Sequence, residues 1–196
     1  MTHPIRVGFA LTGSFCTHDR ALSSVQALVD KGFSVTPILS ECAGTLDTRF
    51  GTAAALRQAL KALTGSVIID TVTAAEPIGP KALFDVLVVA PCTANTLAKL
   101  AAGIADGTVP MAVKSHLRGG RPVVLAVSTN DGLAASAANL GALLARRHYY
   151  FVPLRQDAPC AKPRSLVADF SLLPDAVESA LRGEQLQPIL LAPGNA

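Results

Sequence analysis

Two short stretches of the chain, residues 84–90 (FDVLVVA) and 122–127 (PVVLAV), are apolar along almost their whole length instead of at alternate positions. A strand shows this pattern when both faces of its sheet are covered, as in parallel sheets. Segments with helical periodicity alternate with these and other strand-like runs. The sequence therefore predicts an α/β fold in which a parallel sheet carries helices on both faces.

The remaining elements are predicted from hydrophobic periodicity and from residues that typically begin or end helices. Further strands are expected at residues 5–11, 33–39, 67–69 and 149–152. Helices are expected at 18–31, 52–64, 95–102, 111–116, 134–147 and 174–182. A chain of 196 residues suits one domain, which we place at residues 1–186, followed by a loose C-terminal tail at 187–196.

The composition argues against several classes of binding partner. A net charge of +3 on 196 residues does not favour nucleic acid or an anionic membrane, and aromatic residues make up only 5%. No apolar run approaches the roughly 20 residues of a membrane span, and the N-terminus lacks a signal-peptide pattern. The four cysteines form no C-x-x-C pair and the four histidines are scattered, so we expect a cytoplasmic protein with reduced thiols and no metal site.

Polar residues follow four of the predicted strands, at the sheet edge where parallel α/β folds bind their ligands. The candidate cofactor-binding residues at these strand ends are Thr12, Gly13, Ser14, Phe15, Ser40, Pro91, Thr93, Asn95, Thr96, Ser128, Thr129 and Asn130. Their convergence predicts a preformed small-molecule site better than any single loop does. The pattern G-x-G-x-x-G is absent, so a standard dinucleotide fingerprint is not expected.

Each loop taken singly leaves alternatives open. The segment around Gly13 fits either an anion site at a helix start or an ordinary strand-to-helix turn. Ser40 and its neighbours fit plain turn chemistry. Thr93, Asn95 and Thr96 supply more polar groups than one helix cap requires, which indicates ligand contact.

Two cations and one cysteine have both a functional and a structural interpretation. Lys162 and Arg164 lie in a Pro-rich stretch, where they fit either a solvent-exposed loop or a site for carboxylates or phosphate. Cys92 precedes a predicted helix start, which can activate a thiol, but a free cysteine is more often a small buried apolar residue.

Two of these segments resemble the flavin-site motifs of the homo-oligomeric flavin-containing Cys decarboxylases. They are Thr12-Gly13-Ser14 and residues 91–106 (PCTANTLAKLAAGIAD), and the resemblance covers roughly residues 5–155. It implies a three-layer Rossmann-like fold of the flavodoxin type, a flavoprotein-like domain that assembles into trimer-based homo-oligomers. It also implies FMN as the cofactor, held by the strand-end residues named above.

The sequence departs from the decarboxylases at two places. Pro77 stands where their catalytic His is expected, and residues 128–132 (STNDG) replace their P-x-M-N motif. Instead, the segments 75–80, 127–133, 150–153 and 162–169 resemble one branch of the family. That branch implies an oxidoreductase that acts with a second, different polypeptide. Together the two polypeptides convert a dihydrodipicolinate-type precursor to dipicolinate during sporulation. The second polypeptide is then the expected NAD(P) binder.

A dicarboxylate product requires cations or N–H donors, and Asn95, Asn130, Lys162 and Arg164 are the candidate substrate-binding residues. No residue is assigned as catalytic, although Glu76 is one of two conceivable bases and Asp131 is the other. An FMN-dependent decarboxylase of the wider family is the alternative. A third interpretation is an assembly or regulatory protein with a vestigial ligand site.

Overall fold

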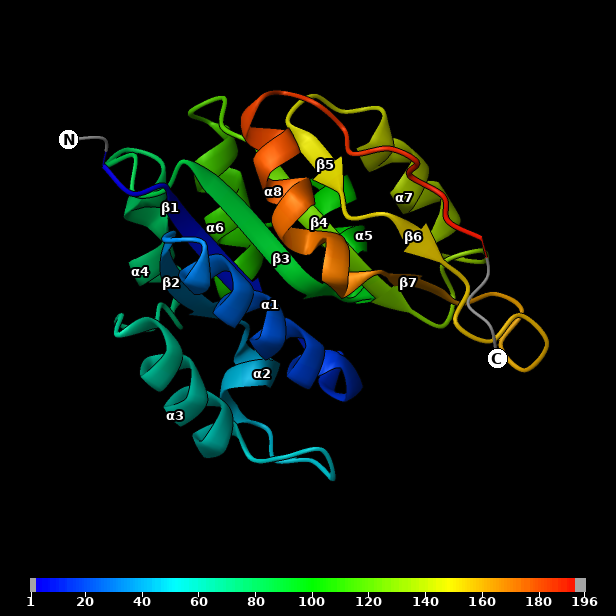
Figure 1. Ribbon diagram of the computed structural model, residues 1–196, viewed down its shortest axis with the longest axis horizontal. Coiled ribbons are helices and arrows are strands. Elements are labelled where there is room, and N and C mark those ends of the chain that lie inside the picture. The colour runs from blue at the N-terminus through cyan, green and yellow to red at the C-terminus, as the bar shows by residue number, and fades with distance from the viewer. Residues whose placement is uncertain (1–2, 193–196) are drawn as a thin grey trace.

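The computed structural model describes residues 3–192, through which a seven-stranded sheet runs with helices on both faces (Figure 1). The strands are β1 (Arg6–Leu11), β2 (Ser34–Leu39), β3 (Val86–Cys92), β4 (Val123–Thr129), β5 (Tyr149–Phe151), β6 (Leu154–Arg155) and β7 (Leu166–Ala168). Every residue of β3 is buried, as the continuous apolar run predicts. The α/β fold class is confirmed.

Helices cover both faces of this sheet. They are α1 (His18–Asp30), α2 (Glu41–Thr45), α3 (Ala53–Thr64), α4 (Val72–Ala75), α5 (Ala94–Ala102), α6 (Thr108–Leu117), α7 (Ala137–Leu144) and α8 (Leu173–Leu181). Three short 3₁₀ turns are η1 (Phe15–Thr17), η2 (Glu76–Ile78) and η3 (Phe170–Leu172). Helices α1 and α8 pack together on one face, in front of β3 and β4 in Figure 1, and α5 and α6 lie behind the sheet.

The strand order reverses direction in the middle of the sheet. The parallel strands run β2-β1-β3-β4-β5, so the chain moves outward from β1 in one direction and then returns to the other side. The helices that follow β1 and β3 leave on different sides at this reversal, and folds of this kind bind ligands at the carboxyl ends of these two strands. This is the edge where the polar strand-end residues are predicted to meet.

Two predicted elements are wrong in detail. Residues 67–69 form no strand, and only one bridge joins Ile69 to Ile38. The helix expected at 134–147 is limited to α7, because the Asp131 carbonyl accepts from the Ala134 and Ser136 N–H groups and holds residues 131–136 in turns.

Helices α2 and α4 and strands β6 and β7 were not predicted. Helix α2 follows Ser40 directly, where the sequence indicates only a turn. Strands β6 and β7 pair antiparallel with each other, and β7 pairs antiparallel with the end of β4. We call residues 154–168, which contain both strands, the β6–β7 hairpin. It extends an otherwise parallel sheet beside the predicted site.

The last described residues lie against the hairpin. The Leu154 N–H donates to the Ile189 carbonyl, and the Leu191 N–H donates to the Leu154 carbonyl. Residues 193–196 of the predicted tail lie outside the described part of the chain, and the domain boundary at residue 186 stays a prediction. Among residues 3–192, no helix combines the length and apolar character needed to cross a membrane.

Candidate functional site

Thr12 joins the loops that follow β1 and β3. Its buried hydroxyl donates to the Pro91 carbonyl at 2.7 Å and accepts from the Thr93 N–H at 3.2 Å. A threonine satisfies both groups because its hydroxyl is at once donor and acceptor. Three of the predicted cofactor-binding residues therefore meet where β1 and β3 end.

The other two strand ends reach the same place. The Ser14 hydroxyl lies 3.1 Å from the Ser128 hydroxyl at the end of β4. After β2, the Ser40 N–H donates to the Leu11 carbonyl at 3.0 Å. The convergence of four loops, predicted from the sequence, is present in the structure.

The helix start after β1 has no side-chain cap, a feature that it shares with α7 and α8 but not with α2 to α5. A side-chain oxygen caps each of α2, α3, α4 and α5, and these caps are Ser40, Thr52, Thr71 and Thr93. Within residues 3–192, neither η1 nor α1 has a side-chain cap, and no hydrogen bond is found from the backbone N–H of Gly13 or Ser14. Free donors at a helix start suit an anionic group.

The position of Gly13 has room for a Cβ atom. A Cβ placed on Gly13 would meet its nearest neighbours, in Cys42 and Phe15, at 3.7 Å, which is ordinary contact. The chain's own packing therefore does not demand a glycine at this position. We call this group of residues, Thr12–Phe15 with Thr93 and Ser128, the cradle.

His18 contacts two residues of the cradle, a role that the sequence does not indicate. Its Nε2 atom lies 2.8 Å from the Thr12 carbonyl, and its ring is 5.2 Å from the ring of Phe15. Burial lowers the pKa of His18. The imidazole is therefore held neutral at neutral pH, where it donates to Thr12 and orders the loop.

Asn95 is not the first capping residue of α5. Thr93 caps the helix by accepting from the Thr96 N–H at 3.2 Å, and the hydroxyls of these two threonines lie 3.0 Å apart. Asn95 occupies the first turn with an exposed side chain, and no hydrogen bond of its amide is found within the described residues. The amide is available to a ligand.

The polar residues after β4 serve mainly to hold their own loop. The Thr129 hydroxyl donates to the Asp131 carboxylate, which also accepts from the Ser136 hydroxyl at 3.0 Å. Asp131 is thus occupied by the loop, contrary to its suggested role as a base. Asn130 between them is exposed, and Ser128 is buried under β7.

Lys162 and Arg164 lie in the turn of the β6–β7 hairpin. The Lys162 ammonium is 3.2 Å from Asp157, which also accepts from the Ser165 hydroxyl at 2.6 Å. The Ser165 hydrogen bond, more than the Lys162 charge, lowers the pKa of Asp157. The Arg164 carbonyl accepts from the Leu133 N–H at 2.9 Å, so this turn sits against the loop after β4. The Arg164 side chain is exposed.

Two other candidates are placed away from the cradle. Cys92 points into the core, and burial raises the pKa of its thiol to about 12, so it is a packed apolar residue and not a nucleophile. Glu76 is exposed in η2, and its carbonyl accepts from the Ser115 hydroxyl near the far end of α6. Pro77 follows it in the same turn.

Glu41 is a structural carboxylate that sequence reasoning missed. Its Oε1 atom accepts from the Thr108 N–H at 2.8 Å and from the Thr108 hydroxyl at 2.9 Å. Although burial opposes ionisation, these hydrogen bonds lower the pKa of Glu41. Glu41 caps the start of α6 although it lies 67 residues earlier in the chain, so no local sequence pattern predicts this contact.

Within residues 3–192, no group of three or more His, Cys, Asp or Glu side chains is arranged to hold a metal ion. The donors that the structure brings together are instead hydroxyls, amides and backbone N–H groups at the cradle. Such a donor set suits the phosphate and ring oxygens of a nucleotide-like cofactor.

Comparison with known proteins agrees with a nucleotide-like cofactor. The sequence matches the family Flavoprotein over residues 1–150. It is 43% identical over 186 residues to the B subunit of dipicolinate synthase from Bacillus subtilis (strain 168), covering 95% of this chain and 93% of the relative. The crystal structure of the same B subunit from Bacillus halodurans C superimposes with a TM-score of 0.89 at 42% identity, covering 97% of both chains. A dodecameric FMN-dependent UbiX-like decarboxylase from Escherichia coli O157:H7 gives a TM-score of 0.62 at 27% identity, covering 76% of this chain and 80% of the other.

Proposed function

The chain belongs to the Flavoprotein family, and from that premise we propose that it is the B subunit of a dipicolinate synthase. In this proposal it acts with the A subunit of the synthase to oxidise a dihydrodipicolinate-type precursor to dipicolinate during sporulation. The observation that carries the proposal is the similarity to two B subunits over almost the whole chain, the β6–β7 hairpin included.

FMN is the proposed cofactor of the cradle. The free N–H groups of Gly13 and Ser14 and the paired hydroxyls of Ser14 and Ser128 are donors of the type that a flavin phosphate or ring oxygen requires. Asn95 adds an exposed amide from the next loop. A bound flavin would supply the acceptor for the hydride equivalent that leaves the dihydro ring, while the protein orients the two rings.

The substrate is proposed to lie over the cradle, within reach of Asn95, Asn130, Lys162 and Arg164. A ring dicarboxylate carries two negative charges, which are costly to remove from water unless cations or N–H donors replace the solvent. The hairpin turn supplies both cations and is held against the loop after β4 by the bond from Leu133 to Arg164. This contact supports a substrate position beside the turn.

The assembly is proposed to be a trimer-based homo-oligomer that docks the A subunit, with NAD(P) bound by that partner, in the cytoplasm. Leu46 and Phe50 support a contact between copies, because they line one groove with Phe15 of the cradle and have exposed fractions of 49% and 52%. A contiguous patch of exposed apolar side chains is typical of an interaction surface.

A flavin titration tests the cofactor. The absorption spectrum of the purified chain, recorded with and without added FMN, is expected to show flavin bound to the parent protein and none bound to Gly13→Val. The added side chain fills the space beside the free N–H groups while meeting only ordinary contacts at its Cβ. Equal FMN affinity in the variant would remove the cradle as the flavin site.

Co-expression with the A subunit tests the reaction. The complex is expected to form dipicolinate, and Arg164→Lys is expected to reduce the rate about tenfold because a lysine cannot contact a carboxylate through two parallel N–H groups. FMN binding should be unchanged in this variant. A complex that makes no dipicolinate but releases CO₂ from a thiol-containing substrate would favour the FMN-dependent decarboxylase instead. A chain that takes up no flavin and still activates its partner would favour an assembly or regulatory protein.

A further inference from the structure

A cavity of about 460 Å³ lies between α1, the β6–β7 hairpin and η3. Its wall includes Arg20, Ser23, Arg155, Val167, Asp169 and Phe170. The volume falls within the range of roughly 300–1,000 Å³ that small-molecule sites occupy. None of the residues predicted from the sequence to bind cofactor or substrate lines it.

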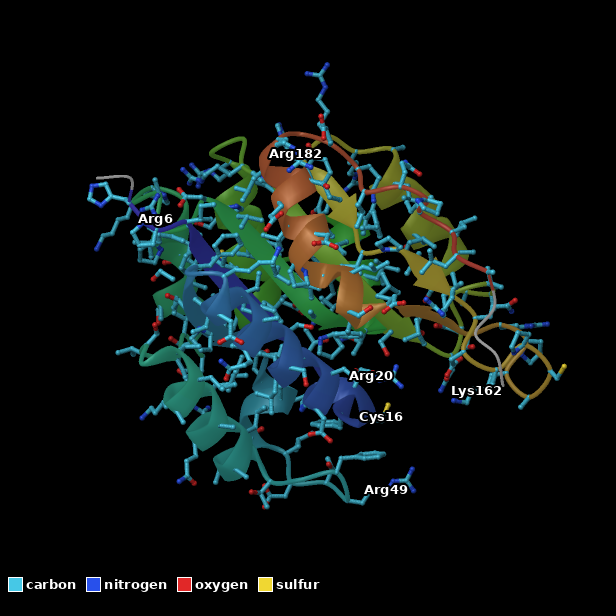
Figure 2. The ribbon with its side chains drawn as sticks, viewed as in Figure 1. Arg6, Cys16, Arg20, Arg49, Lys162 and Arg182 are labelled. Atoms are coloured by element: carbon cyan, nitrogen blue, oxygen red, sulfur yellow. The ribbon has the colours of Figure 1, made fainter. Side chains whose placement is uncertain are left out.

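The cavity adjoins the cradle through β7. Val167 in its wall pairs directly with Ser128 in the sheet, and the Ser128 hydroxyl lies 3.1 Å from Ser14. Figure 2 shows Arg20 beside Cys16, at the end of α1 that faces the hairpin and Lys162. A small ligand in the cavity therefore lies one strand away from the proposed flavin donors.

One cation of the wall is held in place by a carboxylate that is already saturated. Arg155 forms an ion pair with Asp169, whose other oxygen accepts from the Ser171 hydroxyl at 2.6 Å and from the Ser171 N–H at 3.1 Å. Although burial opposes ionisation, these partners lower the pKa of Asp169. A guanidinium has five N–H donors, and the pair with Asp169 uses only part of them. Arg155 is thus a positioned donor with capacity left.

The second cation is not neutralised by the protein. Arg20 is exposed, and no ion pair or side-chain hydrogen bond of its guanidinium is found within residues 3–192. The remaining carboxylate in the wall, Asp157, is already engaged by Ser165 and Lys162. Both acids of the wall are therefore committed to neighbours, while two guanidinium groups retain donors for a ligand.

We propose that this cavity binds a planar dicarboxylate, with Arg155 and Arg20 each receiving one carboxylate. Guanidinium groups bind planar carboxylates through two parallel N–H bonds, which gives orientation as well as affinity. The inference rests on the proposed function, since dipicolinate is the dicarboxylate that the relatives' name supplies. It adds a dicarboxylate site on α1 and β6 that is separate from the substrate position proposed over the cradle.

Calorimetric titration of the full chain with dipicolinate, in the presence and absence of FMN, tests the cavity directly. Arg20→Ala is expected to weaken binding by about tenfold or more, because a charge-assisted pair is lost. Ser23→Phe is expected to abolish binding in this cavity by filling it without removing a cation, and Ser23 is exposed enough to tolerate the change.

Two arginines outside the cavity serve as matched controls. Arg49 lies at the same edge of the molecule, stacked 4.8 Å from the centre of the Phe50 ring, and Arg182 lies at the opposite edge (Figure 2). Arg49→Ala and Arg182→Ala are expected to bind dipicolinate like the parent. Isophthalate, which keeps both carboxylates, should compete with dipicolinate, whereas benzoate should not.

Arg155 requires a milder change, because its removal would leave Asp169 without its cation. Arg155→Lys keeps the charge but loses the planar fork, so dipicolinate affinity is expected to fall while the melting temperature stays near that of the parent. Full affinity in the lysine variant would contradict bidentate binding.

Unchanged affinity in both Arg20→Ala and Ser23→Phe, or no binding of dipicolinate to the parent at millimolar concentration, would overturn the proposal. The outcome is separable from the proposed function. A parent complex that makes dipicolinate, with both variants equally active, refutes the cavity alone. A parent complex that makes none, while Arg20-dependent binding persists, refutes the synthase function alone.

Discussion

The loops after β3 and β4 leave neighbouring strands at the same edge of the sheet and carry similar polar residues, yet they use them differently. After β3, Thr93 caps the helix and Asn95 is left exposed without a partner among the described residues. After β4, Thr129 and Ser136 both donate to Asp131, so the loop consumes its own polar groups.

The difference teaches that a cluster of polar side chains at a strand end is evidence for a site only after the loop's internal needs are met. A short connection that enters a regular helix needs one cap. A longer connection that turns through residues 131–136 must satisfy several backbone and hydroxyl groups before any remain for a ligand.

The largest expected effect concerns Gly132 in the loop after β4. A Cβ at this position would lie 2.7 Å from the Leu166 Cβ, so Gly132→Val must push β7 away from β4. We expect a loss of roughly 3 kcal/mol in the free energy of unfolding, measured by urea denaturation. Gly13→Val, whose Cβ has only ordinary contacts, is the control and should unfold like the parent. Equal stability of both variants would show that the β7 contact gives way easily.

Asp131→Ala should have the next largest effect. It leaves the hydroxyls of Thr129 and Ser136 without their acceptor, and Ser136 is buried. The expected destabilisation is about 2 kcal/mol in the same denaturation experiment. FMN affinity should change little, because the cradle does not use this carboxylate. A loss of flavin binding without a loss of stability would instead place Asp131 in the site.

The pH dependence of the free energy of unfolding distinguishes the two loops from His116, which lies in α6. Burial lowers the pKa of His116 in α6 to about 4, against an ordinary value of 6.5, and its Nδ1 has no hydrogen-bond partner within residues 3–192. The unfolded chain gains this proton near pH 6.5 and the folded chain only near pH 4. The free energy of unfolding should therefore fall by about 1.5 kcal/mol from pH 6.5 to pH 5. His116→Gln should remove this slope and Asp131→Ala should keep it, and the reverse would assign the titration to the loop.

Asn95→Asp should have the smallest effect on stability and a clear effect on binding. The residue is exposed in the first turn of α5, where an acid is tolerated by the helix dipole. The free energy of unfolding should stay within about 0.5 kcal/mol of the parent value. Replacing an N–H donor by a negative charge should weaken FMN or dipicolinate binding at least about tenfold, measured by titration. Unchanged affinity for both would return Asn95 to a purely solvent-exposed role.

The continuous apolar runs determined the buried strands, and the spacing of helical and strand segments determined the α/β class. These features are readable because burial and helix periodicity are set by residues a few positions apart. The motif at residues 91–106 likewise identified the family, since its residues act within one strand, one cap and one helix. The four converging loops followed from the parallel arrangement, in which every strand ends at the same edge.

Only the tertiary structure decided which polar residues are free. The Glu41 carboxylate closes α6 from 67 positions away, and the Asp169 carboxylate holds Arg155 from 14 positions away. Strands β6 and β7 have only two and three residues and are too short to stand out, and they pair because β4 offers an unpaired edge beyond β5. Sequence patterns report local sterics and solvation, whereas a hydrogen bond between distant segments depends on how the whole chain closes. The cavity between Arg20 and Arg155 is a product of that closure.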